Sequence, residues 1–156
     1  MKIMEFLNEQ AIVCDLKAQT KEGVIRELVG VLVHAGAVKE KDVEAIMEIL
    51  KNREALGSTG IGQGVAIPHG KTNVIPQLVG AFGISRIGVD FNSLDGTPAH
   101  LFFLLMAPED SAGPHLKALA RISRLLKDRH FRESLKQARD EKTMLKLLTD
   151  EDHKRH

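Results

Sequence analysis

The sequence predicts an α/β fold in which a β-sheet lies between helices that cover both of its faces, in a single domain that spans residues 1–156. Segments with apolar residues at helical spacing occupy the first and last thirds of the chain, and segments of strand length lie between them. One of these segments, residues 101–107, is apolar throughout, which is typical of a strand buried on both faces. A chain of 156 residues with 43% hydrophobic and 28% charged residues has the size and composition of one globular domain.

Two amphipathic helices are predicted in the first third of the chain. Residues 20–36 place apolar side chains at helical spacing, with Thr20 as the N-cap and Gly36 as the C-cap. Residues 39–56 repeat the pattern, with apolar residues on one side and charged residues on the other. We expect this second helix to end near residues 53–56.

Strands are predicted in the middle of the chain. A short β-like piece at residues 65–67 is ended by Pro68, and residues 77–85 alternate well enough to form a strand. Residues 92–96 are rich in residue types that favour turns, so a turn is predicted between that strand and the apolar strand at 101–107.

The last third of the chain returns to helix. Pro114 suits the first helical position, and the apolar stripe that follows it continues to about His130. Two shorter helices are predicted at residues 131–139 and 141–149. Residues 150–156 are predicted to be a polar tail.

Charge balance and cysteine content exclude several classes of partner. The chain has 22 Lys and Arg against 21 Asp and Glu, so its net charge of +1 provides no basic surface for nucleic acid or anionic membranes. The single cysteine, Cys14, can form neither an internal disulfide nor a thiolate metal cage. No apolar run approaches the ~20 residues that span a bilayer, and the N-terminus lacks the apolar stretch of a signal peptide. We therefore expect a cytoplasmic protein without membrane insertion.

A glycine-rich stretch within residues 53–71 is the main candidate for a functional site. Five of the 13 glycines fall within fourteen residues there. Two nucleotide-binding motifs fail against it. A P-loop ending in Gly70-Lys71-Thr72 would need its first glycine at Val65, and a dinucleotide fingerprint starting at Gly60 would need a glycine at the same position. We therefore predict no nucleotide and no other cofactor.

His69 is the side chain that this stretch positions. Pro68 fixes its own φ and restricts Ile67, while Gly70 permits a turn or a close approach to another group directly after the histidine. An imidazole with an ordinary pKa of ~6.5 is mostly neutral at pH 7 and offers a lone pair as a nucleophile. The preceding glycines leave room for a bulky phosphoryl donor. The alternative is an ordinary loop histidine at the end of a strand.

Several other side chains are candidates for binding a phosphoryl group beside such a nucleophile. His115 lies in the first turn of a predicted helix, where unpaired N–H groups and the helix dipole favour anions. Arg53 could supply positive charge, and Ser58 and Thr59 could hydrogen-bond an anion, with solvated or turn-stabilising roles as the alternatives. His69 and His115 could in principle bind zinc, but no third ligand is apparent, so no metal is predicted.

The sequence resembles the IIA proteins of the bacterial phosphoenolpyruvate-dependent phosphotransferase system (PTS), in the fructose/mannitol family with its EIIA type-2 domain. The match is carried by Arg53-Glu54, by Gly-Ser-Thr-Gly-Ile-Gly-x-Gly-Val-Ala-Ile-Pro-His-Gly-Lys at residues 57–71, and by His115-Leu116 at the start of a long helix. The Gly-Ser-Thr-Gly-Ile-Gly form is most similar to the nitrogen-regulatory branch, the IIA-Ntr proteins. The resemblance covers essentially the whole chain and implies a mixed sheet between helices.

This resemblance implies a phosphocarrier with a phosphohistidine intermediate, an enzyme in the loose sense of a PTS transferase component. His69 would accept the phosphoryl group on Nε2 from phosphorylated HPr or its nitrogen-branch counterpart, and His115 would hydrogen-bond that group. Further support for the phosphoryl group is expected from Arg53, Ser58, Thr59 and Gly70.

Three functions remain open. In the first, the protein is a regulator whose phosphorylation state alters binding to target proteins such as a sensor kinase or a potassium-transport component. In the second, it is a sugar-specific IIA subunit that passes phosphate from His69 to a IIB partner in fructose/mannitol-type uptake. In the third, it is a ligand-binding or scaffold domain with an inert His69. We favour the first, because the sequence contains no IIB or membrane IIC segment and carries the regulatory form of the glycine motif.

Overall fold

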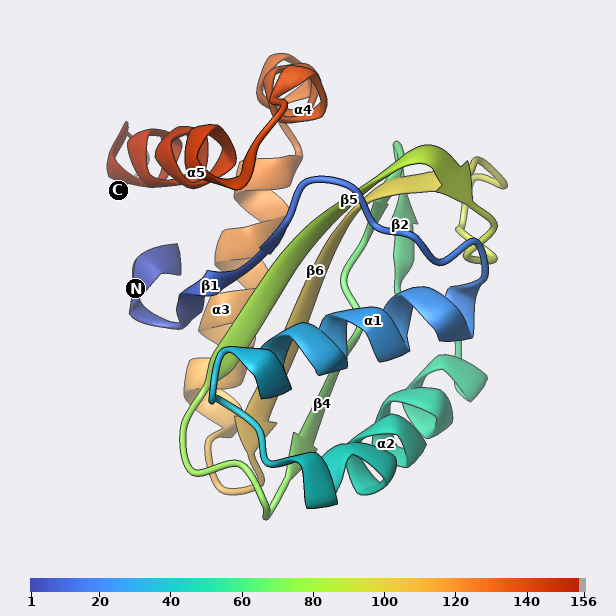
Figure 1. Ribbon diagram of the computed structural model, residues 1–156, viewed down its shortest axis with the longest axis vertical. Coiled ribbons are helices and arrows are strands. Elements are labelled where there is room, and N and C mark those ends of the chain that lie inside the picture. Colours follow the sequence, from blue (N-terminus) through green and yellow to red (C-terminus); the bar gives the residue numbers. More distant parts are fainter. Residues whose placement is uncertain (155–156) are drawn as a thin grey trace.

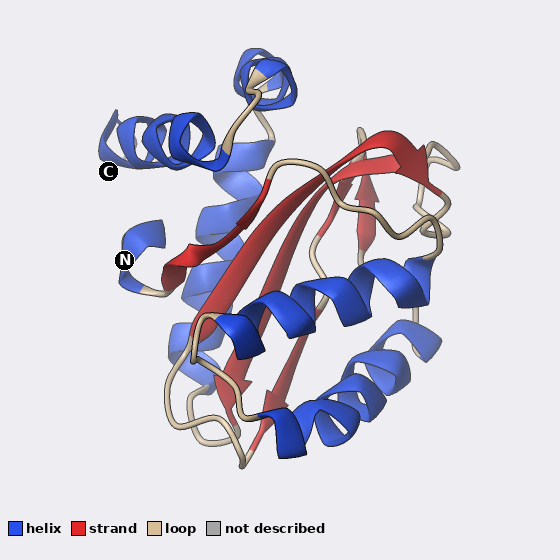
Figure 2. Ribbon diagram, viewed as in Figure 1, coloured by secondary structure: helices blue, strands red, loops and turns tan. Residues whose placement is uncertain are grey.

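A six-stranded mixed sheet forms the centre of the fold, and helices cover both of its faces (Figures 1 and 2). The computed structural model describes residues 1–154, and it confirms the predicted architecture. The elements follow one another as a 3₁₀ turn η1 (Ile3–Glu5), β1 (Leu7–Val13), α1 (Lys21–His34), a 3₁₀ turn η2 (Glu40–Asp42), α2 (Val43–Ala55), β2 (Gly60–Gly62), β3 (Val65–Ala66), β4 (His69–Thr72), β5 (Val79–Val89), β6 (Ala99–Pro108), α3 (Ala112–Leu126), α4 (Arg129–Gln137) and α5 (Glu141–Lys154).

Strand β6 lies at the centre of the sheet. The strand order is β1-β5-β6-β3-β2, and β4 also pairs with β6. β5 and β6 are antiparallel, whereas β3 and β4 both run parallel to β6. Every residue of 101–107 is fully buried, which confirms the prediction of a strand covered on both faces.

β3 and β4 form one interrupted strand along the same side of β6. Val65 pairs with Leu101 and His69 pairs with Leu105, so the register is the same before and after the break. The break falls at residues 67–68, because Pro68 has no N–H to give to a ladder. The sheet thereby fixes the backbone of His69, and the residues of the break are also held, because the Ile67 N–H donates to the Thr59 carbonyl and the Pro68 carbonyl accepts from the N–H of Leu105.

Each face of the sheet has its own hydrophobic core. Leu28 of α1 and Leu50 of α2 belong to one core, and Ile122 of α3 and Leu148 of α5 belong to the other. Figure 1 shows α1 and α2 in front of the sheet and α3 behind it. Successive side chains of β6 alternate between the two cores, as the pleat of a strand requires.

The first two helices form largely where the sequence predicts them. Thr20 caps α1 by accepting a hydrogen bond from the main-chain N–H of Gly23. Gly36, just after that helix, has a φ of +80°, a conformation that a glycine adopts without strain. The second helix ends at Ala55 as predicted, but its first turn is the 3₁₀ turn η2, so α2 itself begins at Val43.

Helix α3 differs from its prediction at both ends. It begins at Ala112, two residues earlier than expected, so that Pro114 occupies the third helical position. The N–H groups of the first turn have no partner within a helix, and the missing N–H of a proline is tolerated there. The helix ends at Leu126 rather than near His130, because Asp128 starts α4 by capping it.

The predicted polar tail is helical as far as the structure describes it. Helix α5 continues to Lys154, and residues 155–156 lie outside the described part of the chain. Asp152 is 2% exposed, and its carboxylate accepts hydrogen bonds from the Arg121 guanidinium and from the main-chain N–H of Ile3. These contacts hold the end of α5 against α3 and η1.

The sequence analysis missed β1, β2 and β4, which are short or carry polar residues in their centres. β5 is also longer than predicted, because it continues to Val89. Within residues 1–154, no helix is long and apolar enough to cross a membrane.

Candidate functional site

An open cleft of about 850 Å³ lies where the end of α2, strand β4 and the start of α3 meet. Four of the predicted site residues line it: His69 and Gly70 from β4, Arg53 from α2 and His115 from α3. Tertiary structure therefore brings together side chains from three elements that are far apart in the sequence.

The ring of His69 is oriented by its own segment of chain. Its Nδ1 lies 2.7 Å from the main-chain oxygen of Ile67, the residue at the break between β3 and β4. A carbonyl oxygen can only accept a hydrogen bond, so the network assigns the proton to Nδ1 and leaves a lone pair on Nε2. The ring is half-buried. Burial, and to a smaller extent the positive charge of Arg53, lower the pKa of His69 below its usual value.

His115 lies beside His69. The two ring centroids are 5.5 Å apart and the ring planes make an angle of 72°. His115 is 6% exposed, and burial is the main reason that its pKa is lowered to about 4, followed by the charge that His69 carries when it is protonated and by the charge of Lys71. Its Nε2 is buried and has no hydrogen-bond partner in residues 1–154. A buried ring nitrogen without a partner is suited to a polar atom of a bound group.

The main-chain N–H of His115 is not one of the unpaired N–H groups that the sequence analysis expected in the first turn of this helix. It donates to the carbonyl oxygen of Ser111 at 3.0 Å, because α3 starts earlier than the sequence analysis expected. The contribution of His115 to the cleft is therefore its imidazole ring alone.

Arg53 provides positive charge at the end of α2. Its Nη1 donates to the carbonyl oxygen of Gly57 at 2.8 Å, which ties the start of the glycine-rich loop to the helix. Its positive charge lowers the pKa of His69, so it acts on that ring, though less strongly than burial does. Lys71, exposed on β4, adds a second cation to the cleft lining.

Ser58 and Thr59 are not brought into the cleft. The hydroxyl of Ser58 donates to the carbonyl oxygen of Phe91 at 2.5 Å and accepts from the N–H of Gly60 at 2.9 Å. Thr59 is 3% exposed and donates both its N–H and its hydroxyl to the carboxylate of Glu54. These contacts stabilise the turn, which is the alternative role that the sequence left open.

Glu54 is a supporting residue to which the sequence analysis assigned no role. Its side chain is 7% exposed and forms an ion pair with Lys21 of α1 at 2.9 Å. Glu54 binds Thr59, and the carbonyl oxygen of Thr59 in turn accepts a hydrogen bond from the main-chain N–H of Ile67 at 3.0 Å. Glu54 is thus connected through Thr59 to Ile67, the residue whose carbonyl oxygen orients His69. The sequence did carry a signal for this role, because Glu54 is a charged residue at the end of a predicted helix, directly before the glycine-rich loop.

Gly70 allows α2 to approach β4. A Cβ at this position would lie 2.7 Å from Cγ2 of Ile49, which is closer than real Cβ contacts. Of the two roles left open by the sequence, a turn or a close approach, the structure shows the close approach.

The rim of the cleft is apolar. Leu56 is 85% exposed and Leu116 is 68% exposed, and both line the cleft. Exposed leucines grouped at a cleft are typical of a surface that another protein contacts. Among residues 1–154, no three His, Cys, Asp or Glu side chains lie close enough to hold a metal ion.

Comparisons with known proteins match nearly the whole chain. Residues 5–151 match the family model described as phosphoenolpyruvate-dependent sugar phosphotransferase system, EIIA 2. A PTS system fructose-specific EIIABC component of Bacillus subtilis (strain 168) is 43% identical over 152 residues, which are 97% of this chain and 24% of that protein. The chain thus spans about a quarter of the length of that relative.

Two nitrogen regulatory proteins match over almost their full lengths. That of Bradyrhizobium diazoefficiens is 39% identical over 148 residues, 95% of each chain. The crystal structure of IIA-Ntr from Neisseria meningitidis is 36% identical and has a TM-score of 0.83, covering 94% of this chain and 98% of that one.

Proposed function

This chain belongs to the EIIA 2 family of the phosphoenolpyruvate-dependent sugar phosphotransferase system, and we propose that it is a phosphocarrier that accepts a phosphoryl group on Nε2 of His69. The single observation that carries the proposal is the hydrogen bond between Nδ1 of His69 and the Ile67 carbonyl. That bond leaves the Nε2 lone pair available without a separate general base, because the nucleophile is already neutral.

The transfer step requires no proton to move at the acceptor. The Nε2 lone pair of His69 forms a bond to phosphorus while the N–P bond of the donor phosphohistidine breaks and returns its electron pair to the donor ring. Nδ1 keeps its proton and its bond to the carbonyl. Phosphoryl transfer leaves little covalent work to the protein, so positioning and charge stabilisation are the main contributions.

His115 and Arg53 are suited to stabilise the transferred group. With its proton on Nε2, a neutral His115 would donate a hydrogen bond to a phosphoryl oxygen and so satisfy the ring nitrogen that is otherwise unpartnered in residues 1–154. Arg53 and Lys71 supply positive charge at the same cleft.

The apolar rim supports a protein as the phosphoryl donor. Leu56, directly after α2, and Leu116 of α3 line the cleft with exposed side chains. A small molecule such as phosphoenolpyruvate would not cover them. A small HPr-like carrier protein, itself phosphorylated on histidine, fits this surface.

The destination of the phosphoryl group distinguishes two candidate functions. The match to nitrogen regulatory proteins over 95% or more of their lengths favours a regulator, whose phosphorylation state controls a sensor kinase or a potassium-transport component. The alternative is a sugar-specific subunit that passes the group to a IIB partner, which is supported by the 43% identity to a fructose-specific EIIABC component. Either function is expected of a cytoplasmic protein.

The acceptor assignment is tested by incubating the protein with phosphoenolpyruvate, enzyme I and HPr. We expect one acid-labile phosphoryl group, bonded to Nε2 of His69 in ³¹P and ¹⁵N NMR spectra and lost in His69→Ala. His115→Ala should still be labelled, but more slowly or with a less stable product. His130→Ala, which alters an exposed histidine outside the cleft, serves as the matched control. Full-rate labelling of His69→Ala would show that the assignment is wrong.

The destination is tested by capture with the phosphorylated and unphosphorylated forms. Recovery of a IIB protein that takes up the phosphate would establish the transport function. A kinase or channel subunit that binds one form and not the other would establish the regulatory function.

A further inference from the structure

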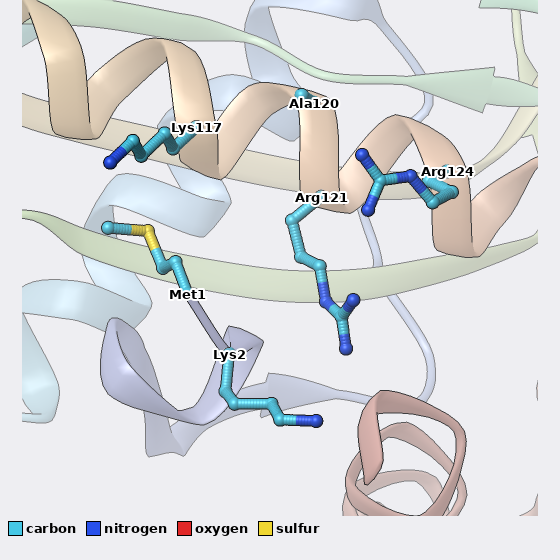
Figure 3. A pocket seen from close by; sticks show the side chains of 6 residues that line it. All are labelled: Met1, Lys2, Lys117, Ala120, Arg121 and Arg124. Atoms are coloured by element: carbon cyan, nitrogen blue, oxygen red, sulfur yellow. The ribbon is translucent and has the colours of Figure 1, made fainter. Parts of the chain in front are cut away.

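A second hollow, of about 380 Å³, lies between the N-terminal segment and α3, and it shares no lining residue with the His69 cleft. We propose that it binds a soluble small molecule that carries phosphate groups. It is lined by Met1, Lys2, Lys117, Ala120, Arg121 and Arg124 (Figure 3). The proposal is independent of the phosphocarrier function.

The lining is strongly cationic although the chain as a whole is nearly neutral. Four of its six residues are Lys or Arg, against a net charge of +1 for the protein. Lys117, Arg121 and Arg124 follow the i, i+4, i+7 spacing that places them on one side of α3. No carboxylate within residues 1–154 forms an ion pair with Lys117 or Arg124. An anion in the hollow would relieve the repulsion among these like charges.

Arg121 is held rigidly in the wall of the hollow. Its side chain is 5% exposed, its Nε donates to Oδ1 of Asp152 at 2.8 Å, and its Nη2 contacts both that oxygen and the main-chain oxygen of the same residue. Nη1 takes no part in these bonds. A guanidinium fixed in this way loses little entropy when it binds a ligand, and its planar N–H groups match phosphate oxygens.

Lys2 is fixed on the other side of the hollow through the same aspartate. Its Nζ donates to the main-chain oxygen of Asp152 at 2.8 Å. Figure 3 shows Arg121 extending from α3 toward the segment that carries Met1 and Lys2. Asp152 is therefore an anchor that Arg121 and Lys2 share, and within residues 1–154 it forms no ion pair with Lys117 or Arg124.

The size and lining of the hollow indicate the class of ligand. A volume of about 380 Å³ falls in the range of ~300–1,000 Å³ that is typical of small-molecule sites. Two arginines and two lysines suit a ligand with at least two negative charges, such as a diphosphate or a sugar phosphate. Met1 and Ala120 leave room for a small organic portion beside the charged groups.

The test is an NMR titration of the full ¹⁵N-labelled chain with inorganic pyrophosphate, at constant ionic strength and with chloride as the reference anion. We expect saturable shifts of the main-chain amides of residues 117–124 and of Lys2 and Ile3. The double variant Lys117→Gln/Arg124→Gln should bind pyrophosphate at this site at least tenfold more weakly. The matched control, Lys41→Gln/Lys127→Gln, removes the same charge from exposed positions outside the hollow and should bind like the parent protein.

Three outcomes would overturn the proposal. The first is the absence of saturable shifts at residues 117–124, and the second is an equal affinity of the double variant and the parent protein for pyrophosphate. The third is binding to phosphatidylglycerol vesicles without binding to pyrophosphate, which would indicate a lipid surface instead. Pyrophosphate that binds the other cleft would shift residues around His69 and also Leu119, which lines that cleft, so the two sites are distinguished by residues 120–124 and Lys2, whose shifts His69→Ala would not change. Failure of either proposal therefore leaves the other intact.

Discussion

The rings of His69 and His115 meet at a centroid distance of 5.5 Å and an angle of 72°, one ring carried by a strand and the other by a helix. Their pKa values are both lowered, that of His115 to about 4, and each ring's burial is the main cause. Both imidazoles are therefore neutral at pH 7. A neutral pair can lie this close without charge repulsion and keeps the lone pair on His69.

Acidification is expected to destabilise the protein through His115. Between pH 6.5 and about 4 the unfolded histidine binds a proton that the folded one does not, so the free energy of unfolding falls as the pH falls through this window. Above pH 6.5 this contribution is constant. The shift corresponds to at most about 3 kcal/mol. Urea unfolding at pH 7, 6, 5 and 4.5 should show a shallower decline for His115→Gln than for the parent protein, whereas His130→Gln should decline like the parent. Parallel declines of His115→Gln and the parent would contradict the argument.

Gly70→Ala is expected to lower the free energy of unfolding by about 1–3 kcal/mol, because the new Cβ would overlap Cγ2 of Ile49. The double variant Gly70→Ala/Ile49→Ala should be less destabilised than the sum of its single variants, since the second change removes the atom that the first one meets. Gly30→Ala is the control. It lies in α1 with nothing within 4 Å of its Cβ, and it should gain about 0.5–1 kcal/mol. Chemical denaturation of Gly70→Ala, Ile49→Ala, their double variant and Gly30→Ala measures these free energies of unfolding. Strict additivity of the changes at positions 49 and 70 would refute the contact.

Glu54→Ala is expected to cost about 1–3 kcal/mol, because it leaves the buried N–H and hydroxyl of Thr59 without their acceptor. It should also shift the ¹⁵N resonances of the His69 ring, because Thr59 accepts a hydrogen bond from the N–H of Ile67, the residue whose carbonyl orients that ring. Glu44→Ala is a matched control on the same helix. Glu44 also pairs with a basic residue of α1, Arg26, but both side chains are at least half exposed, so its loss should cost less than about 1 kcal/mol. An unchanged His69 spectrum in Glu54→Ala would remove Glu54 from the support of the site.

Asp152→Ala is expected to destabilise the protein by about 3–5 kcal/mol, because it leaves the buried guanidinium of Arg121 unpaired. Asp150→Ala, two residues earlier on α5, breaks an exposed pair with Lys146 and should change the free energy of unfolding by less than about 1 kcal/mol. Thermal and urea denaturation of both variants provide the comparison. Equal stabilities would mean that the end of α5 is not part of the folded core.

Local patterns in the sequence were sufficient to predict much of the fold. The apolar run at 101–107 identified the central strand, and capping residues such as Thr20 located helix starts. The position of His69 followed from Pro68 and Gly70, because both act on the backbone of their immediate neighbours. These features depend on short stretches of chain, which is why sequence alone reveals them.

Features that depend on distant partners were missed or misplaced. The carboxylate of Asp152 is buried only because Arg121 reaches it from another helix, and without that partner a charged C-terminal stretch resembles a tail. The hydroxyls of Ser58 and Thr59 bind Phe91 and Glu54 instead of lining the cleft, a choice that depends on how the loop packs.

The main-chain carbonyl that orients His69 has a consequence for the reversibility of any transfer through this ring. A carboxylate in that place would favour the imidazolium form through its full negative charge. It would make the ring more basic, and a more basic ring is a poorer leaving group for a phosphoryl group. The carbonyl of Ile67 carries only a dipole, so it sets the tautomer without raising the basicity of Nε2 to the same degree. The neutral imidazole would therefore be a good leaving group for a phosphoryl group bound at Nε2. The same nitrogen that accepts the group could then also release it to a further acceptor.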